Sequence, residues 1–103
     1  MSDNRINDIV SEVSDEYGVG IDEIMSYSKE PLVCEARSLA MGIAAEQYTL
    51  AYVSRVFNRK NHTTVISAKK RVAELLANDA VFRKRATRVI SKLNERKILK
   101  KKG

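Results

Sequence analysis

Apolar residues recur at helical spacing from the start of the chain. The first set falls at i, i+3, i+4, i+7 and i+11: Ile6, Ile9, Val10, Val13 and Tyr17. This spacing predicts an amphipathic helix of about three turns, which ends at Gly18 and Gly20. We expect a short second helix with Asp22 as its N-cap, followed by a polar loop over residues 26–31 that ends at a proline.

The middle of the chain predicts one long helix and one short helix. Residues 31–47 carry an apolar stripe made of Val33, Ala36, Leu39, Ala40, Ile43 and Ala44. Small residues lie within this helix, Gly42 among them, and would let a neighbouring helix pack closely. Thr49 then caps a short helix over residues 50–57. The core candidates of this helix are Val53, Val56 and Phe57. Asn58 can adopt the left-handed backbone conformation that a sharp turn requires.

Two more amphipathic helices follow. Asn61 is expected to cap the first, whose apolar face consists of Val65, Ala68, Val72 and Leu76. Asp79 is expected to cap the last, whose apolar face consists of Phe82, Ala86, Val89, Ile90 and Leu93. No segment shows the alternation of a strand, so we expect an all-α fold with about six helices. We expect residues 1–94 to form one domain and residues 95–103 to form a basic, disordered tail.

The helix after Asn61 begins with polar, uncharged side chains. They are His62, Thr63 and Thr64, and the other non-apolar positions carry Ser67, Lys70 and Arg71. A short helix joined by a turn to a second helix of this kind is the helix-turn-helix plan. Such a helix suits the major groove of DNA, because its first side chains reach base edges while its amides and lysines hold phosphates. An ordinary amphipathic surface helix explains the same residues, so this stretch alone leaves both interpretations open.

The charge distribution favours a polyanionic partner. The 103 residues carry a net charge of +6. Residues 1–30 hold eight acidic and two basic side chains, so residues 31–103 carry +12. A basic segment of this kind beside a helix-turn-helix pattern favours nucleic acid, while the acidic segment turns its face to water.

Cysteine content and hydropathy indicate in which cellular compartment the protein is expected. Cys34 cannot form an internal disulfide alone, and we expect it to be a small buried residue. No apolar run reaches the length of a membrane span, and the first residues lack the apolar core of a signal peptide. We therefore expect a cytoplasmic protein, associated with the nucleoid or, if a phage encodes it, present in the host cytoplasm.

Two motifs together resemble a known family. Residues 61–65, Asn-His-Thr-Thr-Val, are similar to the Asp-His-Thr-Thr-Val signature of the C-terminal DNA-binding domain of DnaA, the bacterial replication initiator. Residues 37–43 resemble that domain's Arg-x-x-Ala-Met-x-Leu helix, with matches at Arg37, Ala40, Met41 and Ile43. Residues 49–57 resemble its first helix-turn-helix helix. The resemblance covers residues 6–94 and implies a helix-turn-helix of the Trp-repressor-like type.

The resemblance also implies how individual residues would meet double-stranded DNA. Base contacts in the major groove would come from Asn61, His62, Thr63 and Thr64, with Ser67 one turn further on. Phosphate contacts would come from Arg37, Arg59, Lys60, Lys70 and Arg71. Lys29 lies where the family places the arginine that enters the minor groove. The residue types agree with these roles, since an asparagine can pair with adenine and a threonine methyl can pack on thymine.

The chain also departs from the family. The loop over residues 26–31 holds one lysine and one glutamate, where the family is rich in arginine and lysine. Asn61 replaces the family's aspartate and adds a hydrogen-bond donor, which should change the base preferred at that position. No Gly-x-x-x-x-Gly-Lys-Ser/Thr loop is present, so the chain cannot unwind DNA through its own ATP hydrolysis.

These observations favour one function and leave a second open. The first is sequence-specific binding of double-stranded DNA in replication initiation or transcription regulation, in a phage or mobile element that uses only this domain. The alternative is a protein-interaction module that modulates or recruits a host replication initiator through its acidic N-terminal helix. We expect no enzyme and no cofactor, because the sequence shows no nucleophile–base pair, and one histidine with one cysteine cannot build a zinc site.

Overall fold

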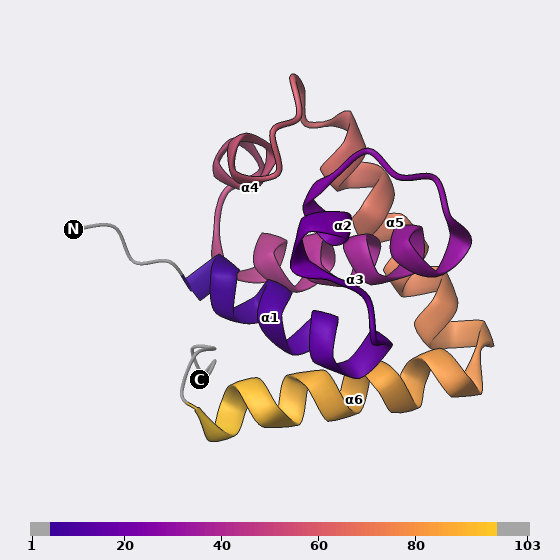
Figure 1. Cartoon of the computed structure of the whole chain (residues 1–103). Coiled ribbons are helices and arrows are strands. Elements are labelled where there is room, and N and C mark those ends of the chain that lie inside the picture. The colour runs from indigo at the N-terminus through magenta and orange to yellow at the C-terminus, as the bar shows by residue number, and fades with distance from the viewer. Residues whose placement is uncertain (1–4, 97–103) are drawn as a thin grey trace.

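The computed structural model describes residues 5–96 and confirms the predicted all-α class (Figure 1). Its helices are α1 (Arg5–Tyr17), α2 (Ile21–Met25), α3 (Pro31–Gln47), α4 (Leu50–Val56), α5 (Thr63–Asn78) and α6 (Ala80–Glu95). Within the described part of the chain, no helix is long and apolar enough to cross a membrane. The tail predicted from residue 95 lies mostly outside this range: Arg96 is the C-cap of α6, and residues 97–103 are not described.

Helix α3 lies at the centre of the fold. It packs against α1, α2, α4 and α5. Its buried residues lie around most of its circumference, which is typical of a helix enclosed by others: Val33, Ala36, Arg37, Leu39, Ala40, Met41, Gly42, Ile43 and Ala44. Helix α5 approaches closely at Gly42, where an added Cβ would lie 3.0 Å from Cγ2 of Val72. The close packing predicted for the small residues of this helix is therefore present at Gly42.

Capping contacts fix where several helices begin. Thr49 accepts a hydrogen bond of 3.1 Å from the backbone N–H of Tyr52, and Asp79 accepts one of 3.0 Å from Phe82, as predicted. The predicted cap at Asp22 is wrong. Helix α2 begins one residue after Gly20, and the carboxylate of Glu23 accepts the Gly20 N–H at 2.8 Å. Asp22 instead lies in the first turn, where its charge faces the positive end of the helix dipole.

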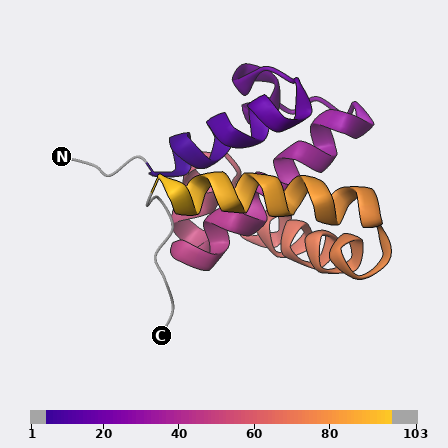
Figure 2. The same cartoon turned by 90° about the horizontal axis from the view of Figure 1, so that it is seen from below.

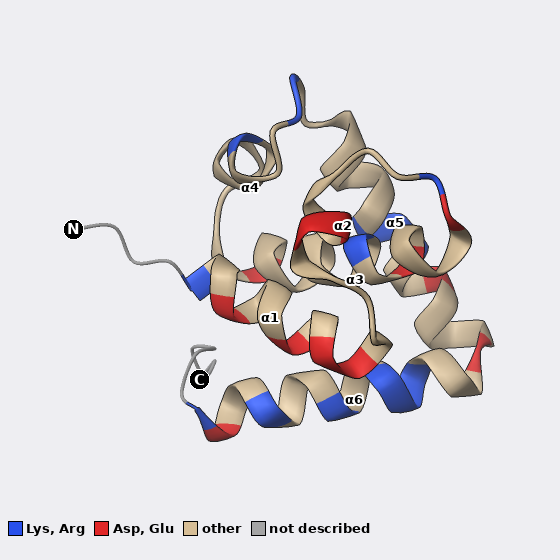
Figure 3. Cartoon of the chain, in the orientation of Figure 1, with Lys and Arg blue, Asp and Glu red and all other residues tan. Residues whose placement is uncertain are grey.

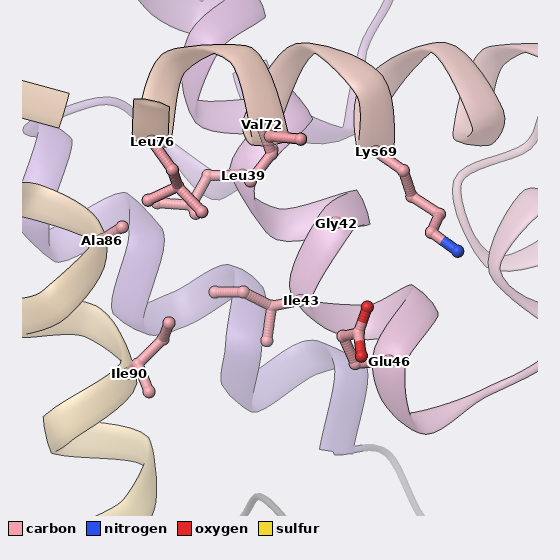
Figure 4. A pocket seen from close by; sticks show the side chains of 10 residues that line it. Leu39, Gly42, Ile43, Glu46, Lys69, Val72, Leu76, Ala86 and Ile90 are labelled. Carbon is pink, nitrogen blue, oxygen red and sulfur yellow. The ribbon is translucent and has the colours of Figure 1, made fainter. Parts of the chain in front are cut away.

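One hydrophobic core joins all six helices, and Phe57 and Phe82 are the largest side chains enclosed in it. An apolar groove of about 370 Å³ opens beside this core between α3, α5 and α6 (Figure 4). Leu76, predicted to lie on the apolar face of α5, lines this groove and is partly exposed. Cys34 is only half-buried, contrary to prediction, because its thiol lies near the surface and donates to the carbonyl of Ser28 at 3.5 Å.

The acidic face of α1 pairs with the basic face of α6 (Figure 3). Arg88 holds Glu16 with two nitrogens: Nε lies 3.0 Å from both carboxylate oxygens and Nη2 lies 2.6 Å from Oε2. Arg96 bridges two carboxylates: its Nη1 donates to Glu12, and its Nη2 donates to Asp8 at 3.4 Å. Three of the eight acidic residues counted in the first part of the sequence, Asp8, Glu12 and Glu16, therefore pair with the last helix and its C-cap.

Acid should weaken this junction between α1 and α6. The hydrogen bond from Arg88 is the main cause that lowers the pKa of Glu16 below its ordinary value of 4.5. The unfolded chain therefore takes up a proton more readily than the folded one, and the stability that the pair supplies is lost as pH falls through and below that ordinary value. We expect the urea midpoint of the wild-type chain to fall more steeply between about pH 6 and pH 3 than that of Glu16→Gln. Parallel pH profiles of the two proteins would contradict this expectation.

The helix-turn-helix and the α1–α6 pair lie at different ends of the molecule. Figure 1 shows α4 and the first turn of α5 at one end and α6 along the other. Figure 2, viewed from below, shows α6 in front of the helices that form the body of the fold. The first turn of α5 is therefore not covered by the acidic leading helix.

Candidate nucleic-acid interface

Helices α4 and α5 form a helix-turn-helix whose turn is fixed by backbone contacts. Phe57 ends α4 and is fully buried, so it anchors the turn to the core. Asn58 has a φ of 59°, the left-handed conformation predicted for it. The next N–H, that of Arg59, donates back to the carbonyl of Ser54 at 2.8 Å. These contacts set the direction in which the chain leaves α4 and enters α5.

The start of α5 differs by one residue from the prediction. His62 is the N-cap, and the helix begins at Thr63 rather than directly after Asn61. Asn61 still performs part of a cap, because its Oδ1 accepts the N–H of Thr63 at 3.0 Å. The His62 side chain makes no capping bond, so the imidazole is not used to hold the helix. The Oδ1 atom of Asn61 is thus occupied by a hydrogen bond within the helix start, whereas the imidazole of His62 stays exposed.

The first turn of α5 presents its polar side chains to solvent. Every residue predicted to contact bases is exposed: Asn61, His62, Thr63, Thr64 and Ser67. The opposite face holds Val65 and Ala68, which are buried in the core. The predicted phosphate contacts Lys60, Lys70 and Arg71 are exposed as well. One helix therefore separates a buried apolar side from an exposed side that is polar at its tip and cationic along its length.

Arg59 ties the turn to the loop that precedes α3. Its guanidinium lies 4.2 Å from the ring centroid of Tyr27 and donates to the carbonyls of Ser26 at 3.1 Å and Phe57 at 2.9 Å. The Tyr27 hydroxyl donates in turn to the carbonyl of Asn58 at 2.6 Å. Much of the hydrogen-bonding capacity of Arg59, a predicted phosphate contact, is thus used inside the protein. Lys29 is exposed on the same loop.

Arg37 is the one predicted phosphate contact that the structure buries. Its Nε donates to the carbonyl of Ile24 at 2.8 Å and its Nη2 to that of Glu23 at 3.3 Å. These carbonyls belong to the last turn of α2, where a cation is also favoured by the helix dipole. The structure therefore corrects the expected surface position: Arg37 holds α2 against α3, and we leave it out of the proposed DNA contacts.

Sequence reasoning missed a polar hollow between α4 and the turn. The hollow has a volume of about 300 Å³. It is lined by Ala51, Ser54, Arg55, Asn58, Arg59, Lys60 and His62. Arg55 was not singled out, although its place four residues before Arg59 puts a second cation on the side of α4 that meets the turn. Within residues 5–96, no group of histidine, cysteine or carboxylate side chains is placed to hold a metal ion.

This geometry, with a buried α3 behind an exposed helix-turn-helix, agrees with a comparison to known families. The bacterial DnaA protein helix-turn-helix family matches residues 6–72, which extend from α1 into the middle of α5. The chain belongs to this family. The match to the DnaA helix-turn-helix includes the whole of α4, the turn and the first turns of α5, whereas α6 lies beyond it.

Curated relatives of the DnaA helix-turn-helix carry the name chromosomal replication initiator protein DnaA. The protein of Aquifex aeolicus is 33% identical over 81 residues, which cover 77% of this chain and 20% of the relative. That of Rickettsia massiliae is 34% identical, covering 76% and 17%, and that of Mycoplasma capricolum is 29% identical, covering 78% and 18%. The chain thus spans about a fifth of the length of these relatives.

Proposed function

We propose that this protein binds double-stranded DNA at a specific sequence, with the first turn of α5 in the major groove. The observation that carries the proposal is the exposed polar tip of α5 on a cationic helix-turn-helix, with the opposite face of the same helix buried. In a groove of B-DNA, such a helix brings side chains within reach of base edges while its flanks meet phosphates. We assign it no catalytic role and no cofactor.

The contacts divide into those that read bases and those that hold the backbone. Asn61, His62, Thr63, Thr64 and Ser67 are the proposed base contacts, and Lys60, Lys70 and Arg71 are the proposed phosphate contacts. Lys29 is the proposed minor-groove contact. Because Oδ1 of Asn61 already accepts the Thr63 N–H, this side chain would offer bases its amide N–H groups. We therefore expect it to favour acceptor atoms such as N7 or O6 of guanine and O4 of thymine.

The relatives are named as replication initiators, which suggests that the binding site lies at a replication origin. A role in transcription regulation, in a phage or elsewhere, rests on the same DNA contacts. In either case the protein would act at the nucleoid. The alternative function, a protein-interaction module, relied on the acidic face of α1. Glu12 and Glu16 on that face already pair with arginines of α6, so the structure adds no support for it.

Selection from a random pool of duplexes tests the proposal. We expect one short sequence to be enriched at both low and moderate salt, because base contacts persist while phosphate attraction weakens. The affinity for random DNA should fall steeply with salt, with a slope set by the number of neutralised phosphates. Enrichment of no sequence at either salt concentration would contradict sequence-specific binding, and co-purification of a protein partner without a DNA footprint would favour the alternative.

A further inference from the structure

The hollow between α4 and the turn has the charge of an anion site. Arg55, Arg59, Lys60 and His62 line it, and no carboxylate does so within residues 5–96. The side chains of Arg55 and Lys60 are exposed and make no hydrogen bond or ion pair with the described residues. Two cations that face one depression without an acidic partner repel each other, and a bound anion would relieve that repulsion.

A buried hydroxyl marks the same hollow independently of its charge. Ser54, on α4, is 3% exposed, and its Oγ has no hydrogen-bond partner among the described residues. An unpaired buried hydroxyl is costly, so one in a native structure calls for an explanation such as a bound ion or water. Ser54 lines the hollow together with Arg55 and Lys60, and it lies on α4, the helix that leads through the turn into the proposed reading helix.

We infer that this hollow binds one phosphate diester of the DNA backbone, held by Arg55 and Lys60 and completed by the hydroxyl of Ser54. The inference rests on the proposed function and assigns it a defined backbone contact. A phosphate bound here lies beside His62 and the first turn of α5, so it fixes how deeply that turn enters the groove. Arg59 takes a smaller share, because the Ser26 and Phe57 carbonyls already accept from its guanidinium.

Neutral backbone linkages test the inference on the selected duplex. Single phosphates are replaced in turn by methylphosphonates, and each duplex is titrated with the wild-type chain and with Arg55→Ala. We expect Arg55→Ala to weaken binding about tenfold and to reduce the salt slope by about 0.9, the loss of one phosphate contact. At one linkage, the methylphosphonate should weaken the wild type clearly more than Arg55→Ala, because both changes remove the contact between Arg55 and that phosphate.

Arg83→Ala is the matched control, since Arg83 is an exposed arginine on α6, away from the helix-turn-helix. It should show no such coupling at any linkage. Additive effects of Arg55→Ala at every linkage, or equal losses with Arg83→Ala, would overturn the inference while the selected sequence stands. If selection yields no sequence, the proposed function fails and this inference fails with it.

Ser54→Ala separates the hydroxyl from the charges. Alanine keeps the helix and removes a group that has no hydrogen-bond partner within residues 5–96, so the urea midpoint should not fall. Binding to the selected duplex should nevertheless weaken about threefold, and the loss should disappear at the linkage that couples to Arg55. Unchanged affinity with a fully folded Ser54→Ala protein would remove Ser54 from the site.

Discussion

Replacing Thr63 and Thr64 together by alanine should remove most of the preference for the selected sequence. Both side chains are exposed in the first turn of α5, and neither hydroxyl bonds to the described residues. A good base contact supplies about 1–3 kcal/mol of discrimination, so losing two should cost at least about tenfold in affinity for the preferred site. Affinity for random DNA should change by less than about threefold, because the cations that attract phosphates remain.

The experiment compares titrations of the preferred and a scrambled duplex at the same salt concentration. Thr87→Ala is the matched control, because Thr87 is an exposed threonine on α6, away from the helix-turn-helix. It should leave both affinities unchanged. A double variant that still distinguishes the two duplexes as well as the wild type would show that the tip of α5 does not read bases.

Phe57→Ala should cause a large loss of stability. The side chain is fully buried at the end of α4, and removing a buried phenylalanine typically costs about 3–5 kcal/mol. The free energy of unfolding of small domains is only about 5–15 kcal/mol, so Phe57→Ala would remove a large part of it. Urea unfolding followed by circular dichroism measures this change as a lower midpoint at similar slope.

Phe82→Ala shows whether a weaker DNA affinity of Phe57→Ala comes from lower overall stability or from the loss of the anchor at the turn. Phe82 is buried to a similar degree but lies on α6, so its removal should lower the free energy of unfolding by a comparable amount. At a temperature where both variants remain folded, only Phe57→Ala should weaken DNA binding, because Phe57 anchors the turn that aims α5. A loss below about 1 kcal/mol for Phe57→Ala would mean that the turn does not depend on this anchor.

The fold class and most helix positions could be predicted from the sequence because apolar spacing determines which side of a helix is buried. Val65 and Ala68 point inward, and the polar residues between and before them are therefore exposed, as the structure has it. Helix starts were less predictable. At Gly20 the decisive contact is a carboxylate three residues away, and at Asn61 a side chain caps from one residue before the N-cap.

The roles of Arg37 and Arg55 could not be predicted, because both depend on how helices meet. Arg37 is buried only because the last turn of α2 ends over it and offers two carbonyls. Arg55 belongs to a hollow that exists only where α4 meets the turn. Spacing along one helix shows which residues share a face, but it does not show which other element lies opposite that face.

The position of α6 has a kinetic consequence. In the proposed complex, a duplex held by the first turn of α5 would lie at the other end of the molecule from α6, whose Lys84 and Lys92 are exposed. These lysines would therefore act on DNA from a distance, through the long-range field of the protein, and we expect them to speed diffusional encounter more than they prolong the bound state. Neutralising them should slow the arrival of DNA at low ionic strength and leave the residence time of the complex nearly unchanged.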